Sequence, residues 1–166
     1  MVRYLTTGPR GPVLIAVASA LIVGAAIASQ VWGGLSPCKL CLYQRVPYAF
    51  TILAGGAAAA AAQRQPRSAA PLAFLCMVAF LAGAGIAAFH VGVEQGWWEG
   101  STACTGVPAG AAATPDELRR LLETAPVVRC DEVQWSLLGI SMAGYNVLVS
   151  LGLAAFAGLT ARTLAR

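Results

Sequence analysis

Charged residues are scarce in this chain. Only 11% of its 166 residues are Asp, Glu, Lys or Arg, whereas 58% are hydrophobic and the mean hydropathy is +0.69. Soluble domains carry about a quarter charged residues, so this composition excludes an ordinary soluble globule. The chain also has one histidine and a single C-x-x-C, which leaves a zinc site short of ligands. No pattern of basic and aromatic residues indicates nucleic-acid binding.

The few charges leave four apolar windows, none of which contains Asp, Glu, Lys or Arg. They cover residues 12–33, 46–62, 69–93 and 137–161. A membrane-spanning helix needs ~20 mostly apolar residues, and isolated strands would leave backbone groups unpaired in lipid. The sequence therefore predicts an all-α membrane protein: one domain over residues 1–166, built as a four-transmembrane-helix bundle with outer loops at about 34–45 and 94–136.

Two local patterns add detail to this bundle. Thr114, Pro115 and Glu117 have the spacing of a helix N-cap with a capping box, so the long second outer loop is expected to contain a short amphipathic helix. In the first window, small residues recur every four positions, which predicts a packing seam. These residues are Ala16, Ala20, Gly24 and Ala28.

The basic residues predict the orientation. The N-terminus, the loop between the second and third windows, and the C-terminus carry six arginines and no acidic residue, whereas the outer loops hold five basic against seven acidic residues. By the positive-inside rule both termini are cytoplasmic. The first window also resembles a signal peptide, but it is long for one. We expect it to stay uncleaved, and a mature N-terminus at Ser29 would contradict this.

Four of the five cysteines fall in the outer loops, where disulfides can form. Cys104 and Cys130 are separated by 25 residues, so a bond between them could be purely structural. Cys38 and Cys41 would close a ring too small to stabilise the fold through chain entropy. Their spacing is typical of redox-active thiols, with half of a zinc site as the main alternative; the pairing of the four cysteines stays open.

Three other residues have competing interpretations. If the second helix begins near Cys38, its dipole favours a Cys41 thiolate and Arg45 lies on the same face one turn later, whereas Pro47 could instead mark the first turn. Arg45 could also be an interfacial arginine that extends its guanidinium to water. His90, at the outer end of the third window, could be a simple polar cap. Cys76, in mid-window, is interpreted as a small hydrophobic residue.

These residues resemble the DsbB family, the disulfide bond formation protein B of the bacterial inner membrane. The resemblance rests on PCKLCLYQR in the first outer loop, HVGVEQGWW at the start of the second, and CDEVQWSLLG before the last window. It covers nearly the whole chain. It implies a thiol:quinone oxidoreductase of the inner membrane, with periplasmic cysteines, that oxidises a periplasmic DsbA-like thioredoxin-fold protein and sustains disulfide formation.

Carried over by position, the resemblance assigns roles to six residues. Cys104 and Cys130 form the disulfide that the partner attacks, Cys104 takes the mixed disulfide, and Cys130 exchanges with Cys38. Cys41 then faces a membrane quinone, either ubiquinone or menaquinone, as a thiolate. Arg45 matches a quinone-side arginine, and His90 lies close to a quinone-proximal histidine. The chain departs from the family in having YQR, where a carboxylate before the arginine is also familiar.

Three alternatives remain at the level of sequence. A vitamin K epoxide reductase-like enzyme is also a small helical membrane protein with a C-x-x-C, although the cysteine order fits it less well. A non-enzymatic membrane protein with disulfide-stapled loops would show no quinone-dependent turnover. A metal-binding membrane module would take up zinc stoichiometrically.

Overall fold

The computed structural model describes residues 2–100, 114, 116 and 129–166. A short helix α1 (Val2–Thr6) precedes the long helices α2 (Arg10–Val31), α3 (Lys39–Arg64) and α4 (Pro66–Glu94). Two-residue strands β1 (Ser136–Leu137) and β2 (Ile140–Ser141) then lead into α7 (Met142–Leu164). The amphipathic helix is expected over residues 114–127, of which residues 115 and 117–127 lie outside the described part of the chain.

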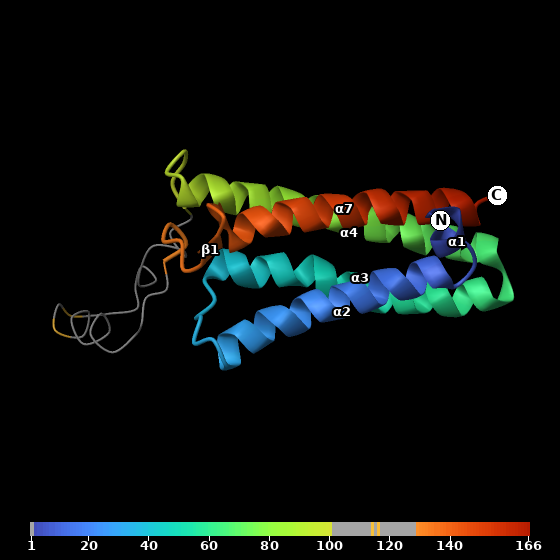
Figure 1. Ribbon diagram of the computed structural model, residues 1–166, viewed down its shortest axis with the longest axis horizontal. Coiled ribbons are helices and arrows are strands. Elements are labelled where there is room, and N and C mark those ends of the chain that lie inside the picture. Colours follow the sequence, from blue (N-terminus) through green and yellow to red (C-terminus); the bar gives the residue numbers. More distant parts are fainter. Residues whose placement is uncertain (1, 101–113, 115, 117–128) are drawn as a thin grey trace.

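The four long helices form one bundle. Helix α4 packs against both α3 and α7, and α3 packs against α2, so the helices run side by side along the long axis of the molecule (Figure 1). Within the described residues these four helices are long and apolar enough to cross a membrane, with mean hydropathies between 1.2 and 2.4. The predicted four-helix membrane bundle is confirmed.

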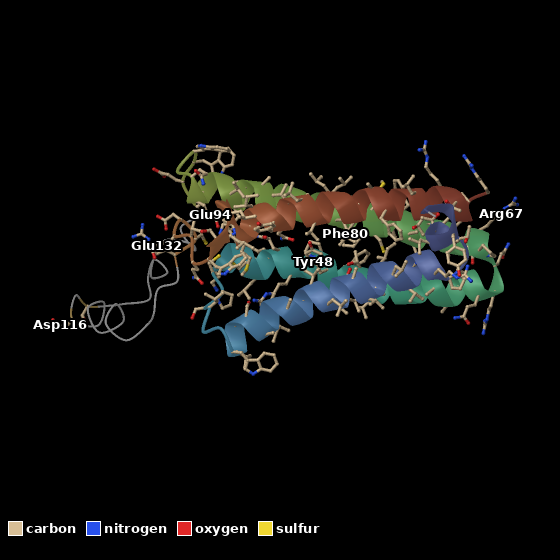
Figure 2. The ribbon with its side chains drawn as sticks, viewed as in Figure 1. Tyr48, Arg67, Phe80, Glu94, Asp116 and Glu132 are labelled. Atoms are coloured by element: carbon tan, nitrogen blue, oxygen red, sulfur yellow. The ribbon has the colours of Figure 1, made fainter. Side chains whose placement is uncertain are left out.

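The two ends of the bundle differ in chemistry. Both termini and the α3–α4 connection lie at one end, and the α2–α3 connection and the β1–β2 hairpin lie at the other (Figure 1). Arg67 marks the first end, whereas Glu94 and Glu132 lie at the second (Figure 2). Cys38, in the short first outer loop, packs against Val93 near the end of α4, so this loop lies at the second end.

Helix α3 begins earlier than the apolar window at 46–62 suggested. Cys38 is its N-cap, with φ −72° and ψ 171°, and the Cys38 sulfur accepts the backbone N–H of Cys41. Pro47 lies inside the helix and does not start it. A thiol thus takes the capping position usually held by a hydroxyl or carboxylate oxygen, and Cys41 lies in the first turn.

Helix α7 begins later than the window at 137–161 suggested. Leu137 pairs with Ile140 across a two-residue turn, in which Leu138 (φ 52°) and Gly139 (φ 78°) are both left-handed, as the tightest hairpins require. Ser141 then caps α7 by accepting the N–H of Gly144 at 3.2 Å. The apolar window begins at 137 and does not separate residues 137–141 from the helix, because a short hairpin can be as hydrophobic as the helix that follows it.

The core is made largely of small side chains. Ala58, Ala69, Ala73, Ala87 and Ala157 are fully buried or nearly so, which allows the helix backbones to approach closely. The seam predicted on the first helix is partly wrong: Ala20 and Gly24 are exposed. The buried side of α2 carries Pro12, Ile15 and Ser19 instead.

Two adjacent glycines of α3 test this packing. A Cβ on Gly55 would lie 3.1 Å from both the Ala16 nitrogen and the Pro12 oxygen of α2, whereas a Cβ on Gly56 would meet nothing within 4 Å. Gly55→Ala is therefore expected to destabilise the bundle by about 1–3 kcal/mol. Gly56→Ala should stabilise it by about 0.5–1 kcal/mol through helix propensity. Thermal unfolding in detergent measures both changes, and equal shifts would contradict the close α2–α3 contact.

Candidate functional site

The two thiols of the C-x-x-C are in direct contact at the N-terminus of α3. The Cys38 S–H donates to the Cys41 sulfur, with 2.9 Å between the two sulfur atoms. The Cys41 backbone N–H in turn donates to the Cys38 sulfur at 3.2 Å. Cys38 is 3% exposed, whereas Cys41 is half-buried and more accessible. The pair therefore presents one protected and one accessible sulfur.

The proton of the reduced pair belongs to Cys38. Its hydrogen bond to Cys41, together with burial, raises the pKa of the Cys38 thiol to about 12. Cys41 is the acceptor in this contact, so its sulfur is the one stabilised when the pair loses a proton. The geometry thus distinguishes Cys41 as the nucleophilic sulfur of the reduced pair.

His90 of α4 lies against this pair. Its Nε2 is 3.6 Å from the Cys38 sulfur and 3.2 Å from the Cys130 carbonyl oxygen. The sequence placed no histidine near the C-x-x-C, and the fold corrects this point: Cys38, Cys41 and His90 place three potential ligand atoms within 4.8 Å of one another. The cap interpretation of His90 is also incomplete, because the ring is buried at 4% exposure.

Cys130 belongs to the same buried cluster. It is 0% exposed and clusters with Cys38, Leu40 and Val93. The two residues that flank Cys130 in sequence pair with each other. Arg129 donates two hydrogen bonds to Asp131, and the Arg129 guanidinium holds the pKa of the Asp131 carboxyl below its usual value. The segment carrying Cys130 therefore reaches the C-x-x-C end of the bundle. Cys104, its sequence-predicted companion, lies outside the described residues.

Arg45 lies one helical turn after Cys41, as the spacing predicted. Its guanidinium donates to Gln30 Oε1 at 3.1 Å and to the Ala26 carbonyl at 3.4 Å, both on α2. These contacts hold the Arg45 guanidinium against α2, so it does not simply extend into water. Cys76 lies elsewhere, fully buried in the core beside Phe80, as expected for a small hydrophobic residue.

A cavity of about 330 Å³ opens beside the thiols. Its polar lining includes Cys38, Cys41, Arg45 and His90, and much of the remainder is apolar, with residues such as Ile22, Val23, Ala26, Met142 and Val149. Ligand pockets typically combine an apolar wall with a few convergent polar groups, at volumes of about 300–1,000 Å³. The site can therefore accept a largely apolar molecule next to a thiol and a cation.

Three polar residues of this region were missed by the sequence reading. Gln44, Tyr48 and Asn146 line the same cavity and are joined by hydrogen bonds across α3 and α7. A signal was present for Tyr48 and Asn146, because polar residues inside apolar windows are costly and often functional. Gln44 lies just before the second window and had no such signal. Gln44 and Tyr48 are four residues apart on one helix face.

The accessibility of the two thiols makes a direct prediction. In reduced protein at pH 8, iodoacetamide should modify Cys41 first and leave Cys38 unmodified until the pH rises well above 9. The reason is that Cys38 is buried and its pKa lies near 12. Peptide mass spectrometry after timed quenching measures the order, and buried Cys76 serves as the internal control. Faster modification of Cys38 than of Cys41 would contradict the proton assignment.

The chain is similar to known proteins over most of its length. The family profile described as "Disulfide bond formation protein DsbB" matches residues 10–160. A "Disulfide bond formation protein B" from Xanthomonas axonopodis pv. citri is 33% identical over 84% of this chain and 82% of its own. Its counterpart from Hahella chejuensis is 31% identical over 81% of both chains.

An uncharacterized protein of Rickettsia prowazekii is 27% identical over 89% of this chain and 83% of its own. No solved structure matches. The family profile covers α2, α3, α4 and most of α7, and it includes the C-x-x-C, His90 and Cys130. The chain belongs to the DsbB family of disulfide bond formation proteins, and this membership makes it a disulfide-forming oxidoreductase with four membrane-spanning helices.

Proposed function

We propose that this protein is a thiol:quinone oxidoreductase that oxidises a periplasmic DsbA-like, thioredoxin-fold dithiol protein and transfers the electrons to a membrane quinone. The observation that carries the proposal is the contact between Cys41 and an apolar cavity that Arg45 and His90 also line. A thiol pair placed at one end of a membrane bundle is accessible both to a water-soluble partner and to a lipid-soluble oxidant.

The proposed location follows from the same arrangement. The arginine-rich end holds both termini and faces the cytoplasm under the positive-inside rule, so the thiol end faces the periplasm of a bacterium with an inner membrane. A periplasmic site suits disulfide chemistry, because the DsbA–DsbB–quinone chain keeps that compartment oxidising. Lipid surrounds the apolar helices and supplies the quinone pool.

The electron path uses two cysteine pairs. A partner thiolate attacks Cys104, the Cys104–Cys130 bond breaks, and Cys130 leaves as a thiolate. Cys130 then attacks the Cys38 sulfur, the Cys38–Cys41 bond breaks, and Cys41 leaves as a thiolate. The second partner thiol releases Cys104, which attacks Cys130 and frees Cys38. Two electrons have then moved from the partner dithiol to the Cys38–Cys41 pair. One disulfide has formed in the partner, the Cys38–Cys41 disulfide has been reduced, and the Cys104–Cys130 disulfide has been restored.

The residues of the cavity fit a quinone. A bound quinone would accept two electrons and two protons. Arg45 provides a permanent cation and a planar set of donors for a carbonyl oxygen, and it also stabilises negative charge on Cys41 one turn away. The apolar lining from α2 and α7 suits the ring.

Turnover in detergent tests this function. Purified protein is mixed with a reduced thioredoxin-fold dithiol protein and either a ubiquinone or a menaquinone analogue, and quinone absorbance is followed. We expect steady quinone reduction that requires both the partner and the protein. If every combination leaves the quinone oxidised, the cysteines act as structural staples and the proposed function is wrong.

A further inference from the structure

The imidazole of His90 is held from both sides. On one side, His90 Nδ1 lies 2.7 Å from Gln44 Nε2. On the other side, His90 Nε2 lies 3.2 Å from the Cys130 carbonyl oxygen and 3.6 Å from the Cys38 sulfur. A carboxylate oxygen of Glu94 is 3.9 Å from the same nitrogen. The ring is thus enclosed between an amide of α3 and the two cysteine-bearing segments.

The Cys130 carbonyl oxygen shows which nitrogen of the neutral His90 ring carries the proton. A main-chain carbonyl can only accept a hydrogen bond, so the contact with Cys130 requires a proton on His90 Nε2. The Glu94 carboxylate on the same side also favours a proton there. In the neutral imidazole the other nitrogen then carries a lone pair, and Nδ1 must accept from the NH₂ group of Gln44.

The same direction of hydrogen-bond donation continues from Gln44 through two more side chains, Asn146 and Tyr48. Because Gln44 uses its NH₂ group for His90, its oxygen is free to accept, and Asn146 Nδ2 lies 2.5 Å from it. The Asn146 oxygen accepts in turn from the Tyr48 hydroxyl at 2.5 Å and from Ser150 at 3.3 Å. We call Tyr48, Asn146 and Gln44 the amide relay. All of its donors point one way, from α3 and α7 toward His90.

We propose that Gln44 and Asn146 are positioning residues that hold His90 as its Nε2–H tautomer, so that the ring donates to the Cys38 sulfur at the junction of the two cysteine pairs. This inference rests on the proposed function, which makes Cys38 the sulfur that exchanges with Cys130. It adds a role for His90 on the thiol side of the site, as the donor at the point where electrons pass between pairs.

The donor acts on the leaving group. When the Cys38–Cys130 bond of the exchange intermediate breaks, a new bond forms from Cys130 to the attacking thiolate and the electron pair stays on the Cys38 sulfur. The single His90 Nε2–H lies between two acceptors, the Cys130 carbonyl oxygen at 3.2 Å and the Cys38 sulfur at 3.6 Å. As negative charge develops on the sulfur, the shared proton stabilises this thiolate by a charge-assisted hydrogen bond. The same nitrogen contacts the Cys130 main chain, so the ring contacts both partners of the bond that breaks.

The relay also bears on metal binding. Cys38, Cys41 and His90 have ligand atoms within 4.8 Å of one another, but the nitrogen that faces the sulfurs is Nε2. A metal needs the lone pair of that nitrogen, and the relay keeps a proton on it. The arrangement therefore favours a hydrogen-bond donor over a metal ligand.

The tautomer can be read without any activity assay. His90 is the single histidine of the chain, so protein made with ¹⁵N-labelled histidine and a histidine-free purification tag gives the ring signals of one residue. In reduced protein at pH 8 we expect a protonated Nε2 and an unprotonated Nδ1 in the nitrogen spectrum. A protonated Nδ1 in the wild type would overturn the proposal.

A variant two hydrogen bonds from the ring tests the relay itself. In Asn146→Asp the carboxylate accepts from the Tyr48 and Ser150 hydroxyls and cannot donate to Gln44. Gln44 must then turn its NH₂ group toward residue 146, so its oxygen faces His90 and Nδ1 gains a proton. Asn146→Leu is the matched control: leucine neither donates to Gln44 nor accepts from it, so Gln44 can keep its NH₂ group on His90 and Nδ1 should stay unprotonated. An Nδ1 that stays unprotonated in Asn146→Asp would show that the relay does not set the tautomer.

The rate of transfer between the cysteine pairs gives the functional readout. In quinone-free protein, reduction of the Cys38–Cys41 pair by the dithiol partner is followed by acid quench, alkylation and mass spectrometry. Gln44→Leu should slow this step about fivefold, as expected for one lost hydrogen bond, and should leave partner attack at Cys104 unchanged. Ser19→Ala is the control, because it removes a buried 2.8 Å hydrogen bond to Thr51 outside the relay and should have no effect on this step.

The two arms separate the possible failures. If the quinone is never reduced but the nitrogen spectrum is as expected, the proposed function is wrong and the tautomer assignment stands. If the quinone is reduced but Gln44→Leu transfers electrons between pairs at the wild-type rate, the positioning role is wrong and the proposed function stands.

Discussion

Cys41→Ser is expected to abolish quinone reduction, with a loss on the order of 10³-fold or more, as for other essential nucleophiles. The reason is that Cys41 is the accessible sulfur of the pair and the acceptor of the Cys38 S–H, while a serine hydroxyl neither forms a disulfide nor ionises near neutral pH. Cys38 alone cannot hold two electrons as a thiol pair. Turnover should therefore stop at the second cysteine pair.

Partial reactions show where the block lies. In Cys41→Ser, the partner should still form a mixed disulfide with Cys104, detected by non-reducing electrophoresis. Cys104→Ser should lose both quinone reduction and the mixed disulfide with the partner. Cys76→Ala is the matched control, because Cys76 is buried in the core beside Phe80, and it should turn over like the wild type. Appreciable quinone reduction by Cys41→Ser would place the quinone-reducing sulfur elsewhere.

Arg45→Ala is expected to lower quinone reduction on the order of 100-fold, as for the removal of one preorganised donor to a developing negative charge. Arg45 lines the cavity beside Cys41 and is held there by Gln30 and Ala26 of α2. Its loss removes a permanent cation from the cavity wall one helical turn from Cys41. Partner exchange at Cys104 should be nearly unchanged, since that step occurs on the loop pair.

Two further variants separate charge from geometry at Arg45. Arg45→Lys keeps the cation but not the planar donor set, and it should recover only part of the lost rate. Gln30→Leu keeps Arg45 and removes its 3.1 Å acceptor, so a smaller loss is expected. Stopped-flow absorbance resolves the quinone step, and quenched alkylation resolves partner exchange. Equal losses in both steps for Arg45→Ala would contradict this division of labour.

The apolar windows predicted the bundle because lipid imposes length and hydropathy on each spanning helix. The ends were less predictable. The sequence allows α3 to start near Cys38 or near Pro47, and the cap at Cys38 fixes the start. The start of α7 was placed too early, because the β1–β2 hairpin is as apolar as the helix that follows.

The site was predicted unevenly for a physical reason. Cys38, Cys41 and Arg45 lie within two helical turns, so sequence spacing alone placed them together. The contact between His90 and Cys38 joins residues 52 positions apart, and it depends on how α4 packs against α3. Gln44 and Asn146 have no motif spacing that links them to the C-x-x-C, and the position of Asn146 inside an apolar window does not identify its partners. Their importance appears only when the hydrogen bonds between helices are known.

An electron count tests the central claim most directly. Fully oxidised, quinone-free protein is titrated anaerobically with the reduced dithiol partner, and then one equivalent of quinone is added. The account predicts that two partner dithiols are oxidised per protein, one for each cysteine pair, and that each quinone added afterwards is reduced at the expense of one cysteine pair. Partner oxidation that never yields reduced quinone, or quinone reduction that needs no cysteine pair, would contradict it.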